Sequence, residues 1–146
     1  MSARQYRVLA VDDNEIHCYS LRKLLAAAGF DVTHAHSGNE ALTVFRQHHP
    51  DAVLLDVGLG DMDGFEVCSA IRAEPGNNSV AVIFHSASGH ARSSPMSTDS
   101  GADAFLTYPV DSEHLISVIR GCIQRRLDTH GKNSDVSGKA IQGPQE

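Results

Sequence analysis

Apolar and polar residues alternate along the chain in blocks that predict strands and helices in turn. Residues 6–11 (YRVLAV), 52–56 (AVLLD) and 80–85 (VAVIFH) are nearly continuous apolar runs, typical of strands covered on both faces. Residues 30–36 form a weaker, more polar run that suits an outer strand, and residues 104–107 (AFLT) form a fifth run. The pattern therefore predicts five strands.

Helical patterns fill the intervals between these runs. Residues 21–28 carry apolar side chains at positions i, i+3, i+4 and i+7, and residues 37–40 (SGNE) match a capping box that opens a second helix. A third helix is expected around residues 65–71, and a last one is capped by Asp111 or Ser112. Strands that alternate with helices predict an α/β fold, an open parallel sheet with helices on both faces.

Two segments depart from this alternation. Residues 88–100 occupy the place of a fourth helix but are rich in serine and contain a glycine and a proline, so we expect that helix to be short or disordered. Residues 128–146 are polar and lack periodicity, which predicts a disordered tail. The folded domain is therefore expected to span residues 1–127.

Composition narrows the class of protein. The chain has 146 residues, a single-domain length, with 41% hydrophobic residues and a formal net charge of −6. The charge and the lack of a basic cluster longer than Arg125-Arg126 argue against direct nucleic-acid binding. No apolar stretch is long enough for a signal peptide or a membrane span, so we expect a cytoplasmic protein without membrane contact.

Candidate chemistry lies at the carboxyl ends of the predicted strands. Asp12 and Asp13 follow the first strand, Asp56 ends the third, Ser86 follows the fourth and Tyr108 follows the fifth. Ligands of open parallel sheets bind at this edge, so these side chains should converge. Three carboxylates in one pocket favour a divalent cation, and an all-oxygen ligand set favours Mg²⁺. With the cation present, one carboxylate is free to act as a nucleophile towards phosphorus.

Four segments together resemble the receiver domain of two-component response regulators. They are VLAVDDNE, AVLLDVGLGDMDGFEV, VIFHSA and GADAFLTYPVDSEHL, and the similarity runs in register over roughly residues 5–126. The resemblance implies a flavodoxin-like, doubly wound, five-stranded parallel sheet with strand order 2-1-3-4-5.

The resemblance also implies roles for individual residues. Asp56 matches the phospho-acceptor, and Asp12 and Asp13 match the acids that bind Mg²⁺ together with Asp56 and the backbone carbonyl of Gly58. The metal shields the approaching anion from the acidic pocket.

Further positions match the part of the family's pattern that transmits the signal. Ser86 matches the switch hydroxyl, which can hydrogen-bond a phosphoryl oxygen, and Phe105 matches the switch aromatic. Pro109 matches a proline that follows a cis peptide bond in the family.

One position departs from the family in its charge. Tyr108 stands where the family carries a lysine, and a phenol supplies no positive charge at neutral pH. His85 and His90 are the nearest substitutes in sequence, but we expect His85 to pack away from the site and His17 to be an exposed helix residue. The chain has nine histidines, and no spacing among them matches a zinc site.

These features predict a stand-alone receiver rather than an enzyme. A histidine kinase or phosphotransfer partner would donate the phosphoryl group to Asp56, and the product would be recognised by a downstream protein. The alternative is a pseudo-receiver, an interaction module with weak or no switching on phosphorylation, which Tyr108 and the poor fourth helix favour. A phosphatase of the haloacid dehalogenase type is disfavoured because those enzymes use D-x-D, whereas Asp12 and Asp13 are adjacent.

Overall fold

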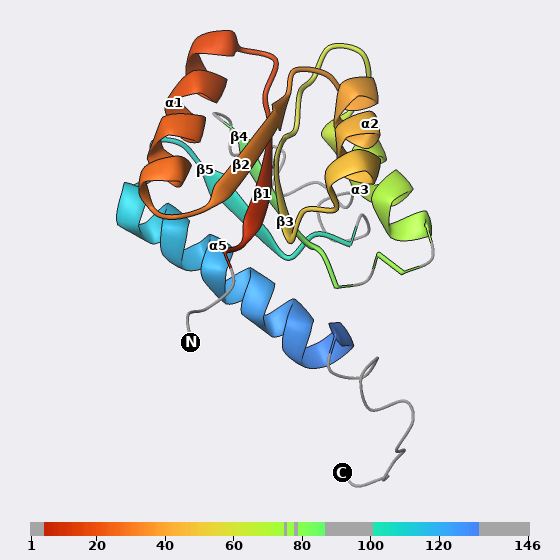
Figure 1. Cartoon of the computed structure of the whole chain (residues 1–146). Coiled ribbons are helices and arrows are strands. Elements are labelled where there is room, and N and C mark those ends of the chain that lie inside the picture. Colours follow the sequence, from red (N-terminus) through yellow and green to blue (C-terminus); the bar gives the residue numbers. More distant parts are fainter. Residues whose placement is uncertain (1–4, 75, 78, 87–100, 132–146) are drawn as a thin grey trace, which may run out of the picture.

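A five-stranded parallel sheet with strand order β2-β1-β3-β4-β5 forms the centre of the molecule (Figure 1). The computed structural model describes residues 5–131 except 75, 78 and 87–100. The strands are β1 (Arg7–Val11), β2 (Asp31–Ala35), β3 (Ala52–Asp56), β4 (Ala81–Ser86) and β5 (Ala104–Thr107). The expected five strands and their order are confirmed, and β4 additionally includes Ser86.

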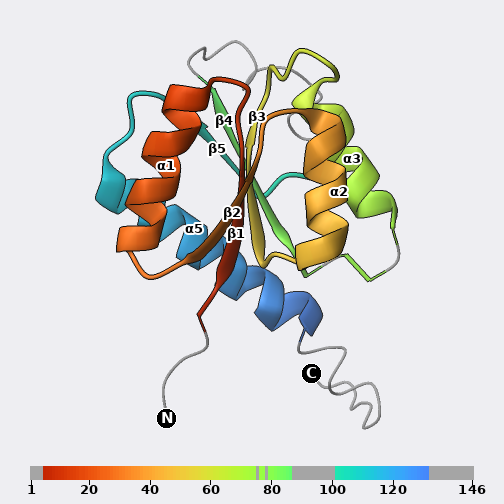
Figure 2. The ribbon, with the colours of Figure 1, turned by 45° about the horizontal axis from the view of Figure 1, so that its top comes forward.

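Helices cover both faces of the sheet, as the alternating pattern predicted. The helices are α1 (Glu15–Ala27), α2 (Gly38–His48), α3 (Gly64–Ala73) and α5 (Ser112–Arg126). Figure 2 shows α1 and α5 on one side of the strands, with α2 and α3 on the other. A π-helical turn, η2 (Leu127–Gly131), continues α5 beyond the residue where the tail was expected to begin. The expected fourth helix and the remainder of the tail, residues 132–146, lie outside the described residues.

Side-chain caps fix where the helices begin. The Asn14 side chain accepts the backbone N–H of His17 (2.9 Å) at the start of α1, and the Ser37 hydroxyl accepts that of Glu40 (3.0 Å) at the start of α2. The Glu40 carboxylate turns back to the N–H of His36 (2.8 Å), one residue before the cap. Each cap stabilises its helix by about 1 kcal/mol. The cap at Asn14 sets His17 in the first turn of α1, directly after β1.

The loop between β3 and α3, residues 57–63, is held close to the end of β3. The Asp61 carboxylate accepts the first two backbone N–H groups of α2, at 2.8 and 3.0 Å. A Cβ atom on Gly64 would lie 2.4 Å from the carbonyl oxygen of Asp56, so only glycine fits there. Gly60 has a φ of +85°, a conformation that glycine adopts without strain. The loop is thus anchored beside the carboxylate of Asp56.

Two hydrophobic cores support the strand ends. Alternate side chains of β1, β3 and β4 point to opposite faces, and each face is closed by one pair of helices. Full burial of one such aliphatic side chain stabilises the fold by about 1.5–3 kcal/mol. Leu9, Val53 and Phe84 pack on the α2/α3 side, whereas Val8, Leu54 and Ile83 pack on the α1/α5 side. The strand ends are consequently held on a rigid frame.

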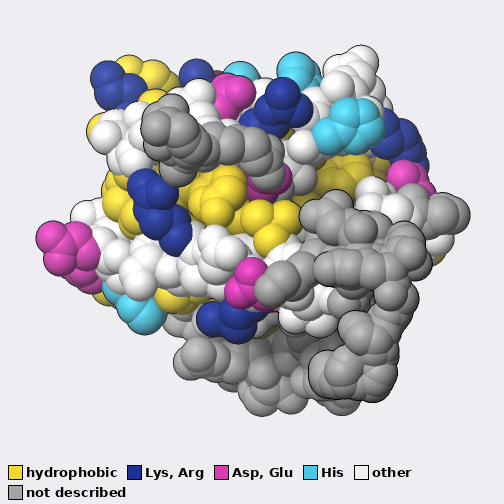
Figure 3. Space-filling view, turned by 60° about the horizontal axis from the view of Figure 1, so that its bottom comes forward, with side chains coloured by type: hydrophobic (Ala, Val, Ile, Leu, Met, Phe, Trp, Pro, Cys, Tyr) yellow, Lys and Arg dark blue, Asp and Glu magenta, His cyan; other side chains and the backbone are white. Residues whose placement is uncertain are grey.

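The surface on the side of the molecule drawn at the bottom of Figure 1 is mixed in charge. Figure 3 brings the bottom of Figure 1 forward, and basic and acidic side chains are interspersed there among hydrophobic ones. Among the described residues, no helix has the length and apolar character needed to cross a membrane.

Candidate functional site

An open pocket of about 360 Å³ lies at the carboxyl ends of the strands. The structure brings together there all five residues that the sequence placed at the strand ends, and adds Asn14, His17 and His85. The lining residues are Asp12, Asp13, Asn14, His17, Asp56, His85, Ser86 and Tyr108. The strand-end pocket that the parallel sheet predicted is therefore present.

Three carboxylates converge in this pocket. Asp12 is buried, Asp13 is exposed and Asp56 is half-buried, and one oxygen of each lies within 4.8 Å of the others. Burial raises the pKa of Asp56 to about 6, with a further contribution from the charge of Asp12. The pocket thus disfavours a further negative charge.

The donor set fits a hard divalent cation. Carboxylate oxygens at this spacing, in a pocket open to water, are the ligands that Mg²⁺ prefers. The backbone N–H of Gly58 donates to the Asp56 carboxylate (3.3 Å), which holds that side chain towards the loop and partly offsets the rise in its pKa. A carbonyl ligand from Gly58 stays a prediction.

The buried carboxylate of Asp12 has a second partner in His17. One oxygen of Asp12 accepts the backbone N–H of Asn14 (2.9 Å), and the other contacts Nδ1 of His17 in a short hydrogen bond. The His17 side chain is 37% exposed and lines the pocket. The expectation that His17 is simply an exposed helix residue is wrong, because its position in the first turn of α1 turns the ring towards Asp12.

The second histidine of the pocket is His85, near the end of β4. It is only 1% exposed, and its Nε2 hydrogen-bonds the backbone carbonyl of Val11 (3.3 Å). Its ring meets those of His17 and Tyr108 edge-on, with centroids 5.7 and 5.4 Å away. Burial lowers the pKa of His85, which keeps the ring neutral.

The expectation that His85 packs away from the site is also wrong. Alternation along β4 sends Phe84 into the α2/α3 core and His85 to the other face. So close to the end of the strand, that face opens into the pocket.

Tyr108 forms a wall of the pocket. Its ring lies edge-on to that of His17, with centroids 4.6 Å apart, and its backbone N–H donates to the carbonyl of Ser86 (2.9 Å). Within the described part of the chain, its buried hydroxyl has no hydrogen-bond partner. Burial, together with the charges of Asp12 and Asp56, raises the pKa of Tyr108 further above its ordinary value, so the phenol is neutral. The peptide bond to Pro109 is cis.

The two residues expected to transmit a signal occupy different places. Ser86 lines the pocket at the end of β4. Phe105 does not line this pocket; its ring lies 5.7 Å from that of Phe84 and packs on the α2/α3 core. A switching role for either residue stays a prediction.

His17 and His85 are the pocket residues that the sequence interpretation did not place. A signal for His17 was present, because Asn14 is a good helix cap and the third residue after a cap remains close to the strand end. No comparable local signal marked His85, since its neighbours in the pocket come from β1, α1 and the segment after β5.

Comparison with known proteins identifies the family. A sequence model described as the response regulator receiver domain matches residues 8–120. This segment includes the five strands, apart from the first residue of β1, and the first nine residues of α5. Receiver domains are signalling modules rather than enzymes, they bind Mg²⁺ at an acidic pocket, and they generally act with histidine kinases.

Curated relatives are about 30% identical to the chain over the aligned residues. The DNA-binding dual master transcriptional regulator RpaA of Synechocystis is 31% identical over 94% of this chain and 57% of its own length. The DNA-binding response regulator MtrA of Mycobacterium tuberculosis is 30% identical over 99% of this chain and 62% of its own length. The chain thus spans about three fifths of the length of these two relatives.

Solved structures share the fold. A receiver domain protein from Methanospirillum hungatei superimposes with a TM-score of 0.78 at 25% identity, covering 86% of this chain and 99% of that one. A putative response regulator from Chloroflexus aurantiacus has a TM-score of 0.78 at 28% identity, covering 84% of this chain and 100% of that one. The chain therefore belongs to the response regulator receiver domain family.

Proposed function

We propose that the chain accepts a phosphoryl group on Asp56 from a phosphohistidine of a kinase or phosphotransfer protein. A carboxylate oxygen of Asp56 forms the new bond to phosphorus as the phosphorus–nitrogen bond of the partner breaks, and the released imidazole takes up a proton. The observation that carries the proposal is the meeting of three carboxylate oxygens within 4.8 Å around Asp56.

The remaining residues of the pocket have supporting roles in this proposal. Asp12, Asp13, Asp56 and the carbonyl of Gly58 would hold Mg²⁺, which neutralises the charge that builds up between the acids and the incoming phosphoryl group. The Ser86 hydroxyl lines the same pocket and would donate a hydrogen bond to a phosphoryl oxygen. Phe105, half-buried on β5, would change its packing when Ser86 is engaged.

A second function is favoured by Tyr108. A neutral phenol stands where the family pattern has a lysine, and its ring fills part of the pocket wall. Among the described residues that line the pocket, none supplies a fixed positive charge beside Asp56. In this alternative the chain is an atypical receiver that binds partners but responds weakly, or not at all, to phosphorylation.

The output is proposed to be a protein contact in the cytoplasm. RpaA and MtrA are described as DNA-binding, and each is longer than the part that this chain matches. The net charge of −6 and the interspersed charges in Figure 3 support a protein partner for the receiver itself. Stand-alone action stays a prediction.

Intact-protein mass spectrometry after incubation with Mg²⁺ and acetyl phosphate tests the proposal. We expect one phosphoryl adduct on the wild type and on Asp128→Asn, an exposed acid far from the pocket, and none on Asp56→Asn. An adduct that persists in Asp56→Asn would contradict Asp56 as the acceptor.

The variant Tyr108→Lys separates the two functions. If the wild type forms no adduct and Tyr108→Lys does, the pocket is intact and Tyr108 prevents phosphorylation. That result supports the atypical receiver. If both form the adduct at similar rates, the phosphorylated receiver stands and the alternative fails.

A further inference from the structure

The pocket contains a second cluster of potential metal ligands, which shares Asp12 with the three carboxylates but adds two imidazoles. One ring nitrogen of His17, one of His85 and one carboxylate oxygen of Asp12 lie within 4.8 Å of one another. The residues come from the first turn of α1, the end of β4 and the end of β1. Two imidazoles and one carboxylate are a ligand set for Zn²⁺ and similar transition metals rather than for Mg²⁺.

The setting of His85 matches that of a metal-binding histidine. A ring held by a hydrogen bond from one nitrogen to a backbone carbonyl presents its other nitrogen as a ligand. Nε2 of His85 donates to the carbonyl of Val11, and because a carbonyl only accepts, Nδ1 of the neutral ring carries the lone pair. The ring is 1% exposed, so its orientation is fixed by packing.

The contact between Asp12 and His17 is of the kind that a cation replaces. The two side chains share a short hydrogen bond inside the pocket. Bonds of about 2.0–2.2 Å to one ion place two ligand atoms roughly 3.4 Å apart, so the His17 nitrogen would move away from the Asp12 oxygen to admit an ion. His17 can make this adjustment, because its side chain is 37% exposed and lies at the end of a helix, whereas Asp12 is buried.

We infer that Asp12, His17 and His85 form a binding site for a divalent transition metal of the Zn²⁺ class, with the fourth position open to the pocket. Three protein ligands and one open position are typical of zinc sites that act on a bound molecule. The ion would bring positive charge to the side of the pocket walled by the neutral Tyr108. The inference goes beyond the proposed phosphoryl transfer and does not depend on it.

Titration of the metal-free full chain with Co²⁺, followed by displacement with Zn²⁺, tests the site. Co²⁺ reports its ligands through visible d–d absorption. We expect one Co²⁺ per chain with an absorption that Zn²⁺ removes. His17→Ala and His85→Gln should each weaken the affinity by about 10–100-fold or more, the effect known for loss of even an indirect partner. His85→Gln keeps a donor for Val11, and His17→Ala alters only a partly exposed side chain.

A matched control comes from the other histidine pair of the described structure. The rings of His34 and His36 are 5.2 Å apart, with Glu40 close to His36. His36→Ala should bind Co²⁺ as the wild type does. Loss of binding in His36→Ala, unchanged binding in His17→Ala, or no Co²⁺ absorption at all would each overturn the inference.

The variant Asp56→Asn keeps this inference separate from the proposed function. Asp56 is not one of the three ligands, so Asp56→Asn should retain Co²⁺ binding while it loses the phosphoryl adduct. A wild type that binds Co²⁺ but forms no adduct would leave the metal site standing and the phosphoryl transfer rejected. Loss of Co²⁺ binding in Asp56→Asn would place the ion among the carboxylates and overturn the inference.

Discussion

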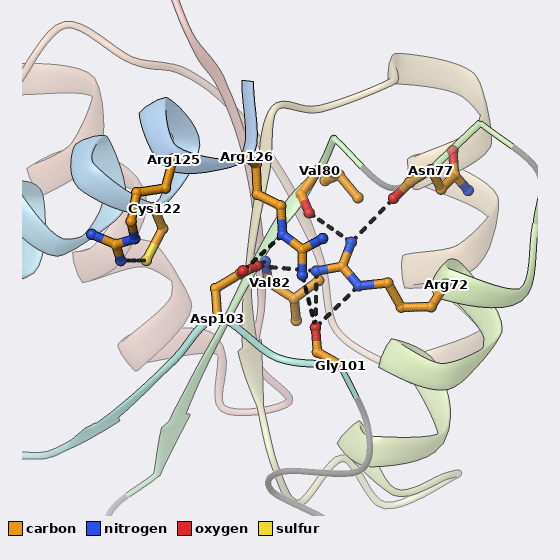
Figure 4. A network of polar contacts seen from close by, with 9 residues as sticks. All are labelled: Arg72, Asn77, Val80, Val82, Gly101, Asp103, Cys122, Arg125 and Arg126. Carbon is orange, nitrogen blue, oxygen red and sulfur yellow. Dashed lines mark hydrogen bonds and ion pairs between the residues drawn. The ribbon is translucent and has the colours of Figure 1, made fainter. Parts of the chain in front are cut away.

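Two polar clusters lie at opposite ends of the strands of the same sheet. They differ in how completely their charges and hydrogen-bonding groups are paired. At the edge where the strands begin, Arg72 and Arg126 converge on Asp103 (Figure 4). At the edge where the strands end, carboxylates, histidines and Tyr108 surround the open pocket. Both clusters are partly buried, and they differ in how well their charges and hydrogen bonds are matched.

The arginine cluster pairs its donors with acceptors. Arg72 donates to the carbonyls of Asn77 (3.1 Å), Val80 (2.7 Å) and Gly101 (3.0 Å) and to the Asp103 carboxylate (3.0 Å). Asp103 also accepts from Arg126 (2.7 Å) and from the backbone N–H of Val82 (2.8 Å). This network ties α3 and α5 to β4 and to the segment that precedes β5. Matched polar groups of this kind stabilise one arrangement of the elements.

In the pocket, by contrast, charges and hydrogen-bonding groups are incompletely paired. It gathers three carboxylates, and burial together with the charges of Asp12 and Asp13 raises the pKa of Asp56. It also leaves the Tyr108 hydroxyl without a hydrogen-bond partner among the described residues. An unmatched cluster costs free energy in the absence of a ligand. The matched cluster thus maintains the fold, whereas the unmatched pocket has the excess negative charge that suits a bound cation.

The largest effect is expected at the matched edge. Asp103→Ala leaves two guanidinium groups without their carboxylate, in a network whose side chains are only 14–17% exposed. The free energy of unfolding, measured by chemical denaturation, should fall by about 3 kcal/mol or more. Asp103→Asn keeps an oxygen that can accept from Val82 and should lose less. A loss below about 1 kcal/mol for Asp103→Ala would show that the cluster is not a structural centre.

An effect of opposite sign is expected at the pocket. The pKa of Asp56 rises from 3.8 to about 6 on folding, so between these values the folded chain binds more protons than the unfolded chain, and stability falls as the pH rises. Without divalent cations, Asp56→Asn should therefore be more stable than the wild type above pH 6, but not below pH 4.

The size of this gain is set by the exposure of Asp56. The full shift corresponds to roughly 3 kcal/mol, and screening of a half-buried group reduces it to about 1–1.5 kcal/mol. Thermal unfolding over a pH series measures the difference, which should shrink when Mg²⁺ is added. A variant with the same pH profile as the wild type would contradict the charge imbalance.

The smallest effect is expected for the unmatched hydroxyl. Tyr108→Phe keeps the ring contacts with His17 and His85 and removes a buried hydroxyl, so stability should stay within about 0.5 kcal/mol or rise by up to about 1 kcal/mol. The matched control is Tyr6→Phe, because the Tyr6 hydroxyl donates to Gln124 (3.1 Å) and its loss should cost about 0.5–1 kcal/mol. A clear loss for Tyr108→Phe would reveal a partner for that hydroxyl.

The sequence predicted the fold well because its signals are local or repeat along the chain. Continuous apolar runs marked the strands, and two predicted helix caps marked helix starts that the structure confirms: Ser37, and Asp111 of the two alternatives Asp111 and Ser112. The return contact of Glu40 differed, because its carboxylate accepts the backbone N–H of His36 rather than that of the cap residue Ser37. The strand order came from resemblance to the family, since periodicity alone does not order strands.

For the site, the sequence by itself determined the acids and hydroxyl at the strand ends, because a parallel sheet brings all those ends to one edge. Only the tertiary structure decided that His17 and His85 face Asp12 and Tyr108. Their spacing along the chain, 68 residues, carries no metal-site signal. Their meeting depends on the sheet order, which sets β4 two strands from β1, and on the helix cap at Asn14, which turns His17 back over the sheet. Contacts between distant segments follow from packing, and packing is a property of the whole fold.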